Sequence, residues 1–289
     1  NPPAANDALI VPLEYREVSF TPMSVGLASD MQSGAFKKEP PPGKGKPNIR
    51  RGRLNPPNGD TNSIPFLWDC AQGKLYLDLN RNEDLTDDAA GTFSTRDVSS
   101  SRRSDYQFAR FTNVLFMLKI EKGRIPWRVD LNFSEYGNHV GVYAYVRSFW
   151  TGKALLGGRE WQVGWIPGAE RRYGMAQNDF FLLRDWSERD VSFTTSDGPL
   201  DAFVFPKKVF LQTAMYEVAR EQVLDGDSLR QQLIFRARPA ELGQVNVSGQ
   251  FIKRLVLTDG PCVAVFDAPQ GTLRAPAGKY GRHHVQLGK

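Results

Sequence analysis

The stretch KLYLDLNRNEDLTDD, residues 74–88, is typical of a β-strand that runs into an acidic loop. Leu75, Leu77 and Leu79 alternate with Tyr76 and Asp78, which is the period-two pattern of a half-buried strand. We therefore expect the three leucines to be buried on one face of a sheet and Tyr76 to be more exposed.

Beyond the leucines, side-chain oxygens recur at alternate positions. The candidate ligands are Asp78, Asn80, Asn82, Asp84 and Asp87. Calcium is a hard cation that takes about six to eight oxygen ligands, and a loop curling around it presents alternate side chains inward. The pattern predicts a calcium site. The alternative is a solvated turn in which Asp and Asn side chains bond to nearby backbone groups.

Residues 78–89 resemble the calcium loop of EF-hands and dockerins, which implies a structural calcium ion. Three departures weaken the likeness. Glu83 replaces the glycine of the sharp turn, and Ala89 stands where a bidentate Glu is expected. A predicted strand, rather than a helix, leads into the loop.

Outward from this stretch, short strand-like segments alternate with Gly, Asp, Asn and Pro turn signals, as in an antiparallel sandwich. A helical alternative for residues 215–229 is interrupted by Asp225-Gly226, so we expect a hairpin there. The fold class is all-β, with one or more antiparallel β-sandwiches and a long Pro/Gly-rich N-terminal loop. The later candidate strands are residues 106–119, 128–133, 140–149, 160–166, 179–183, 202–205, 209–219, 230–236, 245–247, 251–257, 263–266, 271–275 and 280–287.

The N-terminal region has a different composition. We expect residues 1–12 to form an extended tail. Residues 33–63 are rich in proline and glycine, so we expect them to form a loop that contains no central strand. We divide the chain into an N-terminal extension (1–63), a main β-sandwich (64–238) and C-terminal β-hairpins (239–289) that could belong to a second small β module.

The same region holds a basic cluster: Lys37, Lys38, Lys44, Lys46, Arg50, Arg51 and Arg53. The cluster exceeds the net charge of +5, so the rest of the chain is near balance. No aromatic residue interleaves with it between Phe36 and Phe66, so nucleic acid is not favoured as a partner. The simplest interpretation is a solvated, mobile loop.

Near the C-terminus, the segment Pro276-Ala277-Gly278-Lys279-Tyr280 resembles the closing hairpin of prealbumin-like and immunoglobulin-like modules. Together with the acidic loop, it also resembles exported β-rich bacterial proteins of unassigned function. The resemblance implies a sandwich and a periplasmic or extracellular location after removal of a signal peptide. No apolar run reaches the length of a transmembrane segment.

Catalytic motifs are weak. The chain has two cysteines, Cys70 and Cys262, and three histidines, and it contains no G-x-S-x-G, Walker or G-x-G-x-x-G sequence. Carboxylates at Asp185 and Glu188 flank Trp186, an arrangement that a glycosidase could use. Arg184 and Arg189 are adjacent partners for those acids, so a surface charge patch is the competing interpretation.

Two functions remain. The first is a non-catalytic exported β-sandwich protein that binds a polymer, carbohydrate or protein ligand, or a surface, with calcium as a possible stabiliser. The alternative is a carbohydrate-active hydrolase with paired carboxylates near Trp186. A flat aromatic face would favour binding, and a cleft with two carboxyl groups would favour hydrolysis.

Overall fold

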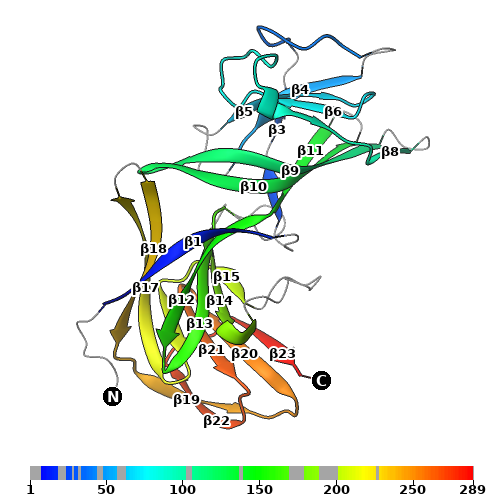
Figure 1. Ribbon diagram of the computed structural model, residues 1–289. Helices are drawn as coiled ribbons and strands as arrows, with labels where there is room; N and C mark the ends of the chain where they lie inside the picture. Colours follow the sequence, from blue (N-terminus) through cyan, green and yellow to red (C-terminus); the bar gives the residue numbers. More distant parts are fainter. Residues whose placement is uncertain are drawn as a thin grey trace. The chain divides into compact units, whose positions relative to one another are not determined.

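The structure is a computed structural model that describes residues 8–18, 24–27, 29–31, 34–43, 48–56, 63–101, 106–136, 139–168, 179–188, 201–225 and 228–288. Strands account for 70% of these residues (Figure 1). The helical elements in these ranges are two short 3-10 turns, η2 (Ala89–Gly91) and η3 (Trp186–Glu188). Within the same ranges, no helix has both the length and the apolar character needed to cross a bilayer. The predicted all-β fold class is confirmed.

Two compact units make up the chain, and each is assembled from separate segments. Unit 1 comprises residues 1–16, 149–166 and 179–289, and unit 2 comprises residues 17–148 and 167–178. The sequence-based divisions after residues 63 and 238 do not coincide with these boundaries. Residues 239–289 belong to the same unit as the N-terminal strand.

Unit 1 contains an eleven-stranded sheet. In order across the sheet, its strands are β15 (Ala202–Val204), β14 (Phe180–Asp185), β13 (Arg159–Ile166), β12 (Ser148–Leu156), β1 (Ala8–Glu17), β18 (Ser228–Arg238), β17 (Ala214–Asp225), β16 (Lys208–Leu211), β21 (Cys262–Asp267), β20 (Ile252–Asp259) and β23 (Arg282–Leu287). The expected hairpin of β17 and β18 is confirmed. β16 and β21 pair in parallel, a departure from the antiparallel pattern.

The long sheet of unit 1 curls so that its inner face forms a core. Phe181 on β14 meets Phe235 on β18, although three strands separate β14 from β18 within the sheet. Trp161 and Trp165 on β13 are each 1% exposed on this inner side. Burying large aromatic side chains in this way removes much apolar surface from water and holds the curled sheet closed.

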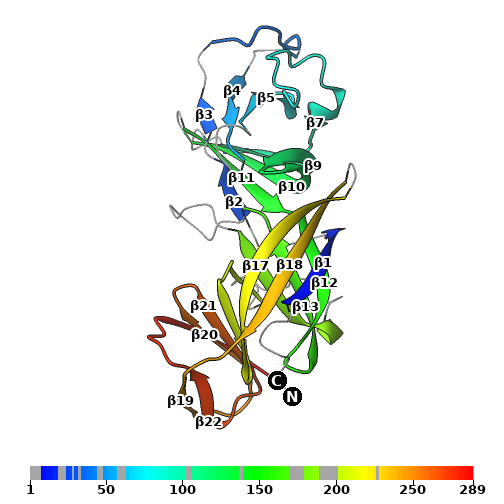
Figure 2. The same ribbon diagram turned by 90° about the vertical axis from the view of Figure 1, so that its left-hand side faces the viewer.

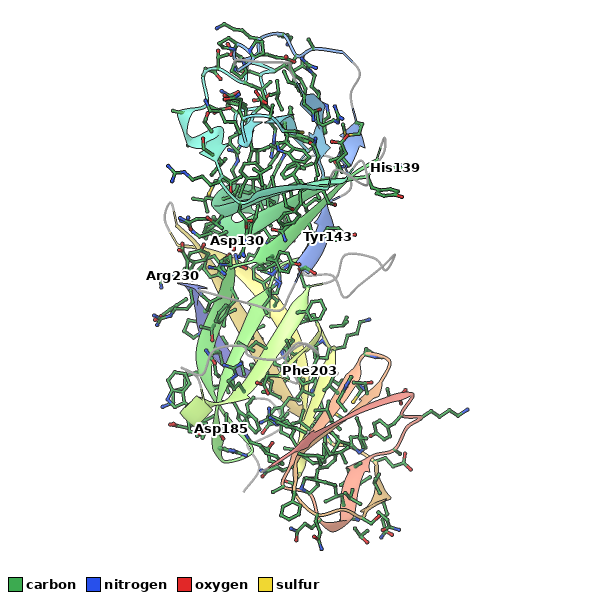
Figure 3. The ribbon with its side chains drawn as sticks, turned by 90° about the vertical axis from the view of Figure 1, so that its right-hand side faces the viewer. Asp130, His139, Tyr143, Asp185, Phe203 and Arg230 are labelled. Carbon is green, nitrogen blue, oxygen red and sulfur yellow. The ribbon has the colours of Figure 1, made fainter. Side chains whose placement is uncertain are left out.

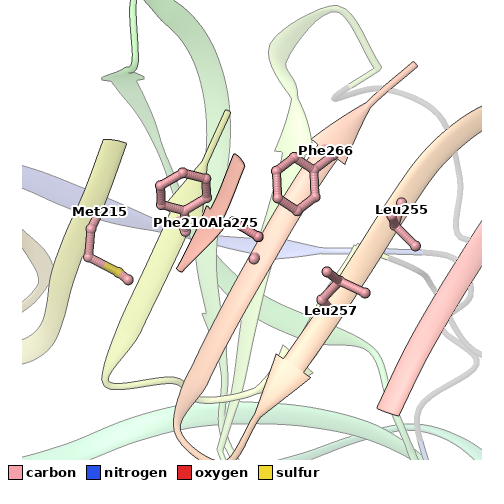
Figure 4. Packing of buried hydrophobic residues seen from close by; sticks show 7 residues of the cluster. Phe210, Met215, Leu255, Leu257, Phe266 and Ala275 are labelled. Atoms are coloured by element: carbon pink, nitrogen blue, oxygen red, sulfur yellow. The ribbon is translucent and has the colours of Figure 1, made fainter. Parts of the chain in front are cut away.

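A second, smaller core lies on the other side of the sheet. The two-stranded sheet of β19 (Leu242–Val247) and β22 (Gly271–Pro276) lies beside β20 and β21 (Figure 2). It covers a cluster that includes Phe210, Leu257 and Phe266 (Figure 4). Alternate residues of β20 and β21 face this cluster, while their neighbours face the inner core.

Unit 2 is a sandwich of two five-stranded sheets. One sheet has the order β2 (Ser24–Leu27), β11 (His139–Val146), β10 (Gly123–Tyr136), β9 (Tyr106–Ile120) and β8 (Val98–Ser101). The other has the order β3 (Ser29–Met31), β4 (Ile49–Leu54), β5 (Ile64–Asp69), β6 (Lys74–Leu77) and β7 (Thr92–Ser94). Phe66 and Trp68 of β5 pack on Phe133 of β10, at ring-centroid distances of 5.3 and 5.2 Å.

The predicted leucine row is largely confirmed. Leu75 and Leu77 are fully buried and Tyr76 is half-buried. The strand ends at Leu77, however, and Leu79 is half-buried in the loop. The loop begins there because the backbone N–H of Leu79 donates to the carboxylate of Asp88 (2.8 Å) instead of to a neighbouring strand.

Two predictions for the N-terminal region are wrong. Residues 1–12 were expected as a tail, but β1 begins at Ala8 and lies between β12 and β18, because the run Leu9-Ile10-Val11 suits a sheet. Residues 33–63 were expected to lack a central strand, but β4 lies between β3 and β5. The arginines of β4 concealed its burial pattern, in which Gly52 and Leu54 face the core.

The predicted closing hairpin around Pro276 and Tyr280 is also wrong. β22 pairs with β19, and β23 pairs with β20, so the strands on either side of this turn do not pair with each other. The Tyr280 hydroxyl instead donates to the backbone oxygen of Pro276 and fixes the corner. Burial raises the pKa of Tyr280 to about 12, so the hydroxyl keeps its proton at neutral pH.

Candidate functional site

The acidic loop is organised around Asp78, whose side chain is fully buried. One carboxylate oxygen accepts the backbone N–H groups of Arg81 (2.6 Å) and Asn82 (3.2 Å), and the other accepts that of Glu83 (2.8 Å). The loop turns sharply because Arg81 and Glu83 adopt left-handed backbone angles, with φ of 66° and 65°. Glu83 thus takes the conformation that glycine takes in a calcium loop.

Three of the five predicted ligands are brought together in this loop. The side-chain amides of Asn80 and Asn82 donate to the two carboxylate oxygens of Asp87, at 3.1 and 2.7 Å. Asp84 instead binds Lys38 at 2.9 Å, and Asp78 holds the backbone. Among the described residues, no group of three or more His, Cys, Asp or Glu side chains is placed to hold a metal ion. Asn80 and Asn82 are not among these residue types, so the calcium site stays a prediction.

Asp84 carries its charge at neutral pH. A hydrogen bond from Thr86 and the ion pair with Lys38 lower the pKa of Asp84 to about 2. The Asp84 carboxylate oxygens are therefore acceptors only, as the ligands of a hard cation are.

The described part of the basic cluster is paired with acids rather than free in solvent. Arg51 binds Glu39 through two bonds of 2.7 Å, Arg53 binds Glu83 at 3.0 Å, and Arg50 binds the buried Glu135 through its Nε at 2.7 Å. The expected solvated loop is thus wrong for β4, whereas residues 44–47 lie outside the described residues. Acidic side chains in unit 2 therefore neutralise much of the positive charge that would attract an anionic polymer.

Asp185, one of the proposed hydrolase acids, forms an ion pair with Arg159. Burial favours its protonated form, but hydrogen bonds from Ser187 and the charge of Arg159 outweigh it, and the pKa of Asp185 is lowered. A catalytic acid needs the opposite shift. Trp186 is half-buried, with the ammonium of Lys153 4.9 Å from its ring centre. Arg189 and Asp190, which follow Glu188 in this segment, lie outside the described residues.

Arg159 also belongs to a chain of alternating charges inside unit 1, which was not predicted from the sequence. The chain contains three arginines and three aspartates, in the order Asp185, Arg159, Asp267, Arg254, Asp201 and Arg184. In the middle of this chain, the Arg254 guanidinium donates to Asp201 at 2.6 Å and to Asp267 at 2.7 Å. Its formal charges sum to zero, so it is a structural network rather than an ion-binding site.

Among the described residues, tyrosine side chains reach the surface of unit 2, whereas most of the tryptophans are buried. Trp161, Trp165 and Trp150 are core residues. On the outward face of the sheet with β10 and β11, by contrast, Tyr143 is 44% exposed and Tyr145, two residues on, is half-buried on the same face.

We call this surface the tyrosine face and define it by Phe108, Arg110, Asn132, Tyr143 and Tyr145. Arg110, Asn132 and Tyr143 are cross-strand neighbours on β9, β10 and β11. Tyr143 has a glycine on each side. Gly26 is its partner on β2, and the Tyr143 ring lies 3.8 Å from the position that a Cβ atom on Gly141 would occupy. Figure 3 shows Tyr143 on its strand. The alternating Tyr-Ala-Tyr of residues 143–145 was the available sequence signal.

The two cysteines are free and belong to different units. Burial, followed by the nearby charge of Glu135, raises the pKa of Cys70 to about 12. Cys70 is thus a neutral, inert thiol near neutral pH rather than a nucleophile.

Comparison of the chain with protein-family models, with curated proteins and with solved structures found no match.

Proposed function

We propose that this protein is a non-catalytic β-sandwich binding protein, located in the periplasm or outside the cell, whose ligand is a carbohydrate polymer. The observation that carries the proposal is the tyrosine face. An exposed aromatic ring between glycines offers a flat apolar surface, and Asn132 and Arg110 supply hydrogen-bonding groups beside it. Sugar rings have an apolar face and a rim of hydroxyl groups, so this combination suits them.

The hydrolase alternative has less support. It needs one protonated and one ionised carboxyl group, and the lowered pKa of Asp185 fits only the ionised role. Binding without hydrolysis requires no such group.

We further propose that the acidic loop binds calcium in a structural role. Asn80, Asn82 and Asp87 already lie together, and Asp78 fixes the backbone of the loop. A bound ion would neutralise the clustered carboxylates and stabilise the connection that follows β6.

The binding proposal is tested by retention of the protein on insoluble cellulose, chitin and xylan. We expect retention on at least one of them, and we expect Tyr143→Ala to weaken it roughly tenfold, the effect of losing about 1.4 kcal/mol. Phe251→Ala is the matched control, because Phe251 is 69% exposed but belongs to unit 1. Absence of retention on all three polymers, or equal loss in both variants, would contradict the proposal.

A further inference from the structure

A pocket of about 180 Å³ lies in unit 2, between the chain that follows β7 and a distorted part of β9. It is lined by Phe93, Ser94, Thr95, Asp97, Arg110 and Thr112, together with the core residue Phe111. Whole small-molecule sites usually occupy roughly 300–1,000 Å³. The pocket is therefore large enough for one ring of a longer ligand rather than for a complete ligand.

One wall of the pocket is created by a β-bulge. The register between β9 and β10 shifts so that Thr112 and Asn113 lie opposite the single residue Asp130. Asp130 is 1% exposed and pins the bulge by accepting the backbone N–H of Asn113 (3.0 Å) and the guanidinium of Arg110 (2.9 Å). Bulges re-aim side chains in this way, and here Arg110 and Thr112 reach the pocket.

The opposite wall is held just as firmly. The backbone of Thr95 donates to Gly73 (2.9 Å), and the backbone of Asp97 donates to the Thr95 hydroxyl (3.0 Å). The Asp97 carbonyl oxygen accepts the backbone N–H of Arg110 (3.3 Å), which joins the two walls. Because both walls are bonded in place, a ligand would not have to order them on binding.

The lining groups define the chemistry of the ligand. Asp97 accepts hydrogen bonds, Arg110 donates them, and Thr112 does both, while half-buried Phe93 provides an aromatic surface. Asp130 also binds Arg147 at 3.5 Å, so the local charges, two acids and two arginines, cancel. A pocket without net charge favours a neutral ligand that both donates and accepts hydrogen bonds.

We propose that this pocket binds a single neutral sugar residue, one unit of the polymer that the tyrosine face binds. The two surfaces share Arg110, which lies on the tyrosine face and also lines the pocket. This inference rests on the proposed function, because it names a second contact for the same class of ligand. It goes beyond the proposed function because it assigns the recognition of one sugar ring to Asp97 and Thr112.

The test is a titration of the full chain, followed by backbone amide NMR, with glucose, galactose, mannose and N-acetylglucosamine as probes. A single ring with few contacts should bind with about millimolar affinity. We expect at least one sugar to shift the amides of residues 93–97 and 110–113. Asp97→Asn and Thr112→Val, which keep the side-chain shapes, should each weaken that affinity at least fivefold, whereas Thr92→Val, outside the pocket, should not.

Three results would overturn the inference: no shifts with any of the four sugars, shifts confined to other residues, or unchanged affinity in both pocket variants. These outcomes are separable from failure of the proposed function. Retention on polysaccharide that depends on Tyr143 but occurs without sugar-induced shifts at the pocket would leave the binding function in place and remove only the pocket.

Discussion

Replacing Arg254 by methionine should destabilise the protein by about 3 kcal/mol, the lower part of the range for breaking a buried ion pair. Arg254 is 4% exposed and lies between Asp201 (2.6 Å) and Asp267 (2.7 Å), with its guanidinium 5.9 Å from the ring centre of Trp161. Methionine keeps much of the packing but leaves two carboxylates with one partner fewer. The cost stays at the lower end because Asp201 retains Arg184 and Asp267 retains Arg159.

Urea unfolding at pH 7, followed by tryptophan fluorescence, measures this loss. The matched control is Arg238→Met, since Arg238 and its partner Glu217 are each 42% exposed and their pair should contribute less than about 1 kcal/mol. Losses of the same small size in both variants would refute the view that the alternating chain of charges holds unit 1 together.

Two further predictions concern the acidic loop and the thiols. Calcium at roughly ten times its Kd should raise the Tm by about 3 °C. Asp87→Ala should abolish this rise, whereas the control variant Glu14→Ala should keep it. An unchanged Tm in millimolar calcium would count against the site. Asp87 is the better position to change because it is exposed, whereas the buried Asp78 maintains the loop backbone. In the folded protein at pH 8, a thiol reagent should modify the half-buried Cys262 faster than Cys70. Cys70 should be spared because it is buried and its pKa is raised to about 12. Equal rates of modification at both cysteines would contradict the burial argument.

Local pattern was enough to predict most of the strands. Where one face is buried, alternation is visible in the sequence, and β6, β9 and β13 were expected close to their observed positions. The β17–β18 hairpin was also expected, but the expected strand 209–219 joins β16 to the first half of β17. β4 was missed because Arg50, Arg51 and Arg53 occupy a strand interior. Each of them has an acidic partner at least twelve residues away in sequence, and no local pattern reveals such a partner.

The pairing of distant strands could not be predicted from the sequence, for a similar reason. The Pro276–Tyr280 turn looks like a hairpin turn, but the choice of β19 and β20 as partners depends on which apolar faces meet, such as those of Leu257 and Phe266. The tyrosine face and the pocket also depend on register, since Arg110, Asn132 and Tyr143 become neighbours only once three strands are aligned. The contacts of Asn80 and Asn82 with Asp87 could be expected because their spacing is local, whereas the pairing of Asp84 with Lys38, 46 residues away, could not.

The position of β1 has a consequence for how the protein is made. Ala8 pairs with Arg236, so the first strand must wait for 228 further residues to be synthesised before its partner β18 exists. At about 5–20 residues per second, this delay is roughly ten to fifty seconds. Residues 17–148 leave the ribosome in the meantime and contain every strand that the structure describes in unit 2, so that sandwich can fold first. During that interval, the run Leu9-Ile10-Val11 lacks β18, one of its two neighbouring strands, so one edge of this apolar strand stays open to pairing with other chains.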